Sequence, residues 1–221
     1  MIKNIIFDLD DTIIKYEDRY ALCYKDVLKK LGYDENEFMS IYQIIDKYEA
    51  TLTKDDFFYS KEKLLEVINH GLGKDYKIEL INEINNSIAK NWLGDILISE
   101  DVMNYLNNKY ECYIFTNWFQ ETQEKRIENI GYKKYFKGIY GADKYGSKPF
   151  KEAFKNILKK IDTKPEECIM IGDNKYTDIY GASSVGIKTI LFDWNGHKNE
   201  KDVNVSGYKI VNNCNEIKEI L

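Results

Sequence analysis

The sequence is short of proline, histidine and cysteine, and each shortage excludes a class of protein. Two prolines and 13 glycines in 221 residues are too few for a linker-rich or low-complexity chain. The four cysteines form no Cys-x-x-Cys pair, and with only two histidines beside them a structural zinc site is not expected. We expect four reduced thiols instead, the usual state of cysteine in the cytoplasm.

Long apolar stretches and an excess of positive charge are also missing. No run approaches the ~18 apolar residues that a membrane-spanning helix needs, and acidic residues interrupt the apolar N-terminus too early for a signal peptide. The formal net charge is −5, which disfavours nucleic acid and membrane surfaces as partners. The sequence therefore predicts a globular cytoplasmic protein, in which a few local charges could still bind a small phosphorylated ligand.

Short and almost continuously apolar runs predict the buried strands of a parallel sheet. They cover residues 2–9, 112–116, 138–140, 168–171, 188–192 and, as a sixth candidate, 208–211. Segments with apolar residues at helical spacing lie between them, at residues 122–130, 149–161 (with Pro149 at its start) and 178–185. Strands and helices that alternate in this way predict a doubly wound α/β sheet.

The alternation breaks between the first two predicted strands. From about residue 15 to residue 94 there is no strand pattern but there are about four helices, which begin near residues 17, 34, 61 and 78. Glycines are expected to end three of these helices, namely Gly32, Gly71 and Gly94. We therefore predict an α/β core formed by residues 1–14 and 96–221, with residues 15–95 inserted as a helical cap.

Two aspartates follow the first predicted strand at its carboxyl end, where open α/β sheets bind ligands. If the strand stays extended, Asp8 and Asp10 point to the same side, with Leu9 opposite. Two carboxylates so placed repel each other, and they either hold a cation, share a proton or take different roles. Mg²⁺ fits such oxygen ligands best. The alternative is a solvated turn, which the buried strand before it disfavours.

Polar residues follow three further predicted strands. Asp173 and Asp178 come after residues 168–171, where a helix N-cap would explain one of the two aspartates but not both. Thr116 and Asn117 end the second strand, and Lys148 stands at the start of a helix, so each could bind phosphate oxygens. Each feature alone is commonplace, but their occurrence at successive strand ends indicates a single site.

These four segments resemble the motifs of the haloacid dehalogenase-like (HAD) superfamily of hydrolases. IIFDLDDTI is similar to the first motif, YIFTN to the second, SKP to the third and IMIGDNKYTD to the fourth. The resemblance covers residues 1–14 and about 96–192, and all four motifs in order are highly specific. The chain has Ser-Lys-Pro-Phe where Lys-Pro-Asp-Pro is more usual, but the lysine remains. The resemblance implies a Rossmann-like core and, from the inserted helices, the phosphatase-type branch.

The resemblance also implies roles for the matched residues in a phosphoric monoester hydrolase. Asp8 would attack phosphorus and form an aspartyl-phosphate, and Asp10 would protonate the leaving oxygen and then deprotonate water. Thr116 and Lys148 would hold the transferred phosphoryl group, with a backbone contact from Asn117. This chemistry is coherent, because a carboxylate that attacks a phosphate dianion needs its repulsion screened.

The implied cofactor is Mg²⁺. By the resemblance it is held by Asp8, Asp173 and the backbone carbonyl of Asp10, while Asp178 supports the metal waters or Lys148. We therefore expect a Mg²⁺-dependent phosphatase acting on a small phosphorylated metabolite. Whether the protein is a monomer or a homodimer stays open.

Three other functions fit the same fold. A phosphomutase would keep every motif residue, a haloacid dehalogenase would need neither Asp10 nor Asp173 in these roles, and a binding module would not need the complete catalytic set. The substrate is not named by the motifs, and we expect the cap to select it. Tyr16 and Glu17 follow the first motif where the cap could meet substrate, and Trp118 and Phe119 either wall the pocket or pack between helix and cap. We assign no role to His197.

Overall fold

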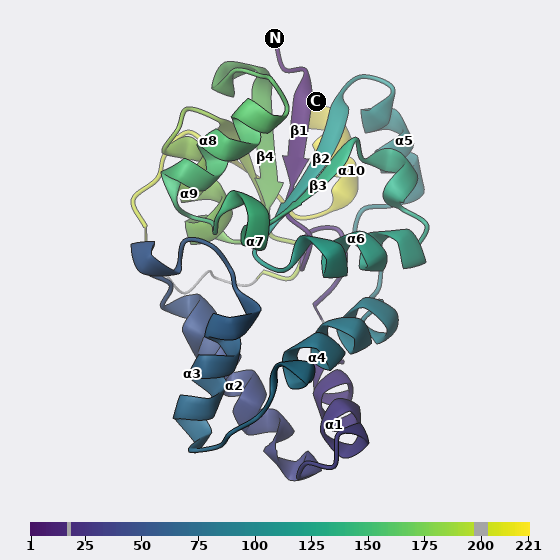
Figure 1. Ribbon diagram of the computed structural model, residues 1–221. Helices are drawn as coiled ribbons and strands as arrows, with labels where there is room; N and C mark the ends of the chain where they lie inside the picture. The colour runs from purple at the N-terminus through teal and green to yellow at the C-terminus, as the bar shows by residue number, and fades with distance from the viewer. Residues whose placement is uncertain (17–18, 197–202) are drawn as a thin grey trace.

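The computed structural model describes residues 1–16, 19–196 and 203–221, so Glu17 and His197 lie outside the described part of the chain. One parallel sheet forms its centre, with the strand order β3-β2-β1-β4-β5-β6 (Figure 1). The strands are β1 (Asn4–Phe7), β2 (Glu111–Thr116), β3 (Gly138–Gly141), β4 (Cys168–Gly172), β5 (Lys188–Phe192) and β6 (Lys209–Val211). The predicted doubly wound α/β fold is confirmed.

The helices fall into two groups. Four follow β1 directly along the chain, namely α1 (Tyr20–Lys30), α2 (Phe38–Ala50), α3 (Lys61–Leu72) and α4 (Ile78–Asn91). The others are α5 (Glu100–Asn107), α6 (Gln120–Asn129), α7 (Ala142–Tyr145), α8 (Lys151–Lys160), α9 (Gly181–Ser183) and α10 (Cys214–Ile220). Short 3-10 turns occur at Glu35–Glu37, Lys54–Asp56, Lys133–Tyr135 and Pro165–Glu167, and a π-helical turn, η5, at Lys175–Tyr180. No helix in the described ranges has the length and apolarity needed to cross a bilayer.

Helices cover both faces of the sheet, which explains why its strands are apolar at nearly every position. Ile5 and Phe7 of β1 pack in one cluster with residues of α5 and α10. Ile6, between them, packs on the opposite face with residues of α8 and α9. Since β2 and β3 lie on one side of β1 and the remaining strands on the other, the carboxyl ends around β1 form the crevice in which such sheets bind ligands.

Helices α1 to α4 form a helical cap beyond the carboxyl edge of the sheet, in the lower half of Figure 1. They pack around an apolar cluster of their own, which includes Leu28, Ile41, Leu64 and Ile84. Phe119, from the loop after β2, is buried in the same cluster. The cap is therefore packed against the edge of the sheet as well as within itself, while the boundaries of residues 15–95 stay a prediction.

The chain passes between core and cap twice, and the two passages lie side by side. The amide of Lys15 donates to the carbonyl of Asp95 at 2.8 Å, and Ile14 forms a bridge with Ile96. A Cβ atom on Gly94 would lie 2.2 Å from the carbonyl oxygen of Lys15. Gly94 is therefore needed for this close approach. The expectation that it ends a helix is wrong, because α4 already ends at Asn91.

Other helix ends differ from the sequence pattern in informative ways. Gly32 follows α1 with φ +75°, as expected, but α3 continues through Gly71 to Leu72, and Gly73 caps it with φ +63°. The expected helix at residues 149–161 begins two residues later, with Phe150 rather than Pro149 next to it. The expected helix at 178–185 is divided between η5 and α9.

Candidate functional site

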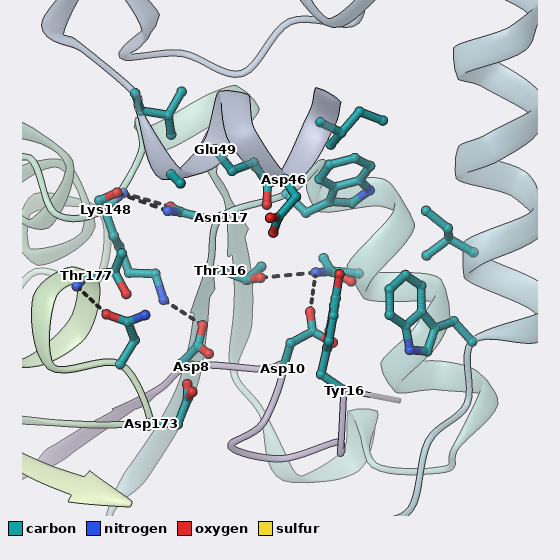
Figure 2. Close-up of a pocket in the computed structure, with 18 of the residues that line it drawn as sticks. Asp8, Asp10, Tyr16, Asp46, Glu49, Thr116, Asn117, Lys148, Asp173 and Thr177 are labelled. Atoms are coloured by element: carbon teal, nitrogen blue, oxygen red, sulfur yellow. Dashed lines mark hydrogen bonds and ion pairs between the residues drawn. The ribbon is translucent and has the colours of Figure 1, made fainter. Parts of the chain in front are cut away.

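A cavity of about 660 Å³ lies between the carboxyl edge of the sheet and helix α2 of the cap (Figure 2). Six of the seven residues that the sequence singled out line it: Asp8, Asp10, Thr116, Asn117, Lys148 and Asp173. The seventh, Asp178, is fully buried and does not line the cavity itself. It contacts Lys148, which does. The strand ends thus bring together residues separated by up to 170 positions in the sequence.

Lys148 is the centre of a buried group of charges. Its Nζ donates to the carboxylate of Asp8 at 2.5 Å and to that of Asp178 at 2.6 Å. Asp8 is fixed because it directly follows β1 and its amide donates to the carbonyl of Ile171 in β4. The lysine side chain is 2% exposed, so water screens these contacts little.

Burial and the neighbouring charges shift the pKa values of Asp8 and Lys148 in opposite directions. Burial raises the pKa of Asp8 to about 7, although Lys148 acts to lower it. Burial acts to lower the pKa of Lys148, but Asp178 and Asp8 together outweigh it and hold this pKa above its usual value. The ammonium group therefore stays charged at neutral pH, while burial opposes ionisation of the carboxylate beside it.

Asp173 adds a third carboxylate, and the set fits a hard divalent cation. Oxygens of Asp8, Asp173 and Asp178 all lie within 4.8 Å of one another. Burial, followed by the charges of Asp8 and Asp178, raises the pKa of Asp173 well above its usual range. A divalent cation would relieve this repulsion with oxygen ligands of the type that Mg²⁺ prefers. Among the described residues no group donates to the carbonyl of Asp10, which leaves that oxygen available as a further ligand.

The loop after β4 is fixed by residues other than its two aspartates. Asn174, not Asp173 or Asp178, caps the following turn, because its side chain accepts from the amides of Tyr176 and Thr177. A Cβ atom on Gly172 would lie 2.3 Å from the carboxylate of Asp178. The glycine therefore makes the space in which Asp178 reaches Lys148, and the helix-cap interpretation of the two aspartates is wrong.

Thr116 and Asn117 occupy the end of β2 and face Lys148 from the other side. The hydroxyl of Thr116 accepts from the side-chain amide of Gln123 at 3.0 Å. The side chain of Asn117 accepts from the amide of Lys148 at 2.7 Å and donates to its carbonyl at 2.9 Å. Asn117 thus fixes the backbone of the lysine, a function of its side chain that the motif did not suggest.

Asp10 has a cationic partner of its own, although its side chain and that of Asp8 line the same cavity. Strand β1 ends at Phe7 and the chain turns at Asp11, with φ +55°, so the two aspartates are not on one extended strand. Instead, the two carboxylate oxygens of Asp10 accept from Arg126 at 2.7 and 3.0 Å. The two aspartates therefore have different cationic partners, which is the arrangement expected where neighbouring acids take different roles.

Sequence reasoning missed Arg126 and Gln123 on α6. Both are buried although the helix looks charged and solvated, and Gln123 also donates to Asp10 at 3.3 Å. Arg126 donates to the carbonyl of Trp92 and lies over its ring, 5.3 Å from the ring centre. One face of α6 is formed by residues 122, 123, 126 and 127. This helical spacing is the signal in the sequence that could have indicated their burial.

Replacing Arg126 with methionine is expected to destabilise the protein by about 3 kcal/mol, because it leaves the carboxylate of Asp10 without its buried partner. Lys125→Met is the matched control, since Lys125 is half exposed on the same helix and its pair with Glu121 contributes at most about 1 kcal/mol. Urea unfolding of both variants measures the difference. Equal losses in the two variants would mean that Asp10 does not depend on Arg126.

The cap supplies the opposite wall of the cavity. Tyr16 and Trp118 line it, as the sequence allowed, but Phe119 does not, because it is buried in the cap cluster. Two acidic residues of α2, Asp46 and Glu49, also line the cavity and were not singled out by the sequence. Figure 2 shows both side chains pointing from the helix into the cavity, toward Thr116.

Comparisons with known proteins agree with the fold and the motifs. The family model described as haloacid dehalogenase-like hydrolase matches residues 5–192. Glyceraldehyde 3-phosphate phosphatase of Pyrococcus furiosus is 28% identical, over all of this chain and 93% of its own length. N-acylneuraminate-9-phosphatase of Mus musculus is 25% identical, over 86% of this chain and 82% of its own.

Solved structures show the same architecture over the whole chain. HAD-hydrolase YfnB of Bacillus subtilis, described as bound to magnesium, has a TM-score of 0.72 at 21% identity and covers 99% of this chain and 98% of its own. L-2-haloacid dehalogenase of Xanthobacter autotrophicus has a TM-score of 0.71 at 13% identity, covering 100% and 98%. At these identities the structures show the fold alone. Since the family model extends from the first strand of the sheet to the fifth, this chain belongs to the haloacid dehalogenase-like hydrolase family.

Proposed function

We propose that this phosphoric monoester hydrolase is a Mg²⁺-dependent phosphatase that acts on a small phosphomonoester through an aspartyl-phosphate on Asp8. The observation that carries the proposal is the separation of the two aspartates. Asp8 lies against the buried ammonium of Lys148, whereas Asp10 lies on the cap side against Arg126. This separation supports Asp8 as the nucleophile and Asp10 as the acid and base.

In the first half of the reaction a carboxylate oxygen of Asp8 attacks phosphorus, and the bond from phosphorus to the leaving oxygen breaks. Asp10 gives that oxygen a proton, for which it turns one oxygen from Arg126 toward the substrate. Lys148 and the hydroxyl of Thr116 hold the phosphoryl oxygens as their charge shifts. In the second half Asp10 takes a proton from water, which attacks phosphorus and releases Asp8 and inorganic phosphate.

Mg²⁺ fits the acidic end of this site. Asp8, Asp173 and the carbonyl of Asp10 would hold it, and when bound it screens the negative charge of the nucleophile and of the phosphate. Asp178 keeps Lys148 in place beside it through the contact at 2.6 Å. The names of the two phosphatase relatives, which specify phosphomonoesters of small metabolites, support the same substrate class.

The first test is hydrolysis of p-nitrophenyl phosphate with Mg²⁺ and with EDTA. We expect turnover that EDTA abolishes and that added Mg²⁺ restores, because three carboxylates and a phosphate dianion repel one another without the cation. Turnover that persists in EDTA would refute the metal requirement. No turnover of this ester or of a panel of phosphorylated metabolites would refute the phosphatase.

Metal binding is tested separately from turnover by thermal unfolding. We expect Mg²⁺ to raise the melting temperature of the wild-type protein by several degrees at saturating concentrations. Asp173→Asn should lose most of this shift. Asp162→Asn is the control, since Asp162 is exposed in the loop before β4 and asparagine tolerates its φ of +50°. The same shift in both variants would exclude Asp173 as a ligand.

A further inference from the structure

The cavity has two ends of different chemistry. The end at the sheet holds the catalytic residues, and a phosphate bound there leaves the rest of the substrate facing the cap. At the cap end, Asp46 and Glu49 lie three positions apart on α2 and therefore on one face of the helix. The leaving group of the substrate, which departs with the ester oxygen, must therefore occupy the part of the cavity next to these two acids.

Among the residues that the structure describes, no cationic side chain pairs with the two acids at the cap end. Among the described residues Asp46 makes no hydrogen bond or ion pair, and the carboxylate of Glu49 accepts only from the hydroxyl of Tyr59. Burial, with Asp46 and Asp10 as neighbouring charges, raises the pKa of Glu49 to about 8. A cation bound beside Glu49 would lower its pKa and favour the ionised carboxylate.

The positive charges of the cavity are already engaged with other acids. Among the described residues that line it, the only cationic side chains are Lys148 and Arg126. Lys148 lies between Asp8 and Asp178, and Arg126 holds Asp10 with both of its terminal nitrogens. A second anionic group on the substrate would therefore have no partner and would face Asp46 and Glu49.

Aromatic rings complete the cap end. Tyr16 lies against Trp92 with the ring centres 4.7 Å apart, and Tyr24 lies against Tyr42 at 6.2 Å. Trp118 lines the same cavity. Rings of this kind attract a cation through the negative charge on their faces, and the attraction is stronger where water is excluded. Acids and aromatic rings around one space are the combination that binds an organic ammonium group.

We infer that the substrate is a phosphomonoester whose leaving group carries a positive charge, that is, a protonated amine or a quaternary ammonium. The inference rests on the proposed phosphatase function and specifies its substrate class. The phosphate binds at Lys148 and Thr116, the ammonium group lies between Asp46, Glu49 and the aromatic rings, and the volume of the cavity suits a small molecule. Esters with a second phosphate or a carboxylate are disfavoured.

The test compares four esters of similar size with wild-type enzyme and Mg²⁺. We expect kcat/KM to be about tenfold or more higher for phosphocholine and phosphoethanolamine than for glycerol 3-phosphate, and lowest for phosphoglycolate. A kcat/KM for phosphoglycolate equal to or above that of the cationic esters would overturn the inference. Equal values for the cationic and the neutral esters would overturn it as well.

Variants connect the preference to the two acids. In the double variant Asp46→Asn, Glu49→Gln the ratio of kcat/KM for phosphocholine to that for glycerol 3-phosphate should fall to near one. Glu62→Gln, at an exposed position on α3, should keep the wild-type ratio. A double variant that keeps the wild-type ratio would refute the assignment. p-Nitrophenyl phosphate separates the two proposals, because no turnover of it refutes the phosphatase, whereas turnover without any cation preference refutes only the substrate class.

Discussion

Asp8→Asn is expected to lower kcat for any phosphomonoester by about 10⁴-fold or more, because no other carboxylate can take over the attack on phosphorus. Asp10 is held by Arg126 on the cap side, and Asp178 is fully buried beneath Lys148. The amide that replaces the carboxylate keeps the shape of the side chain but is a far weaker nucleophile. Turnover of p-nitrophenyl phosphate at saturating Mg²⁺ measures the loss.

The loss must come from chemistry and not from unfolding. Asp8→Asn removes one acid from a cluster in which burial already raises the pKa of Asp8, and Lys148 keeps Asp178 as a partner. We therefore expect the metal-free variant to be no less stable than wild type at pH 8, as measured by urea unfolding.

Asp11→Asn is the matched control for activity. Asp11 lies in the same loop, and its carboxylate accepts from the amide of Tyr16, a bond that asparagine can also accept. Its rate should stay within about tenfold of wild type, since its side chain does not line the cavity. Wild-type turnover by Asp8→Asn would exclude Asp8 as the nucleophile.

The sequence predicts those parts of the site that depend on local pattern. Each strand that leads to a motif residue is a short apolar run, and the range 188–192 coincides with β5. The carboxyl ends of parallel strands meet at one edge, so placing Asp8, Thr116 and Asp173 near one another required no knowledge of distant contacts. The roles of these residues stay proposals, but their common location follows from the order of strands and motifs.

What the sequence could not predict depends on packing between distant segments. Arg126 reaches Asp10 across 116 positions, from a helix whose charge pattern suggests a solvated surface. Asp46 and Glu49 belong to a cap helix, and their sequence positions do not show that they border the cavity until the cap is placed over the sheet. Gly71 is similar, because a Cβ atom there would lie 2.7 Å from a side-chain carbon of Ile44. It permits α2 and α3 to pack closely and does not end the helix.

Lys148→Met is expected to have the largest effect on stability, and that effect depends on pH. The variant leaves Asp8, Asp173 and Asp178 together without the ammonium that offsets their charge. Removing one partner from such a buried group costs about 3–5 kcal/mol when the carboxylates are ionised. It should also lower kcat by about 10²–10³-fold, because a donor to the phosphoryl group is lost.

The sign of the pH dependence follows from the direction of the shifts. Burial raises the pKa of Asp8 and Asp173 above the unfolded value, so the folded protein binds more protons between the two pKa values, and stability falls as pH rises through that range. Without Lys148, which acts to lower both pKa values, the fall should be steeper. The deficit of Lys148→Met should therefore be larger at pH 8 than at pH 5.

Urea unfolding in EDTA at these two pH values measures the deficit. Lys151→Met is the control, because Lys151 is exposed at the start of α8, and it should change stability by no more than about 0.5 kcal/mol at either pH. An equal deficit for Lys148→Met at pH 5 and pH 8 would show that the lysine stabilises the fold by packing alone. A deficit that grows with pH instead requires the ammonium to offset the carboxylates, since only ionised acids repel one another in its absence.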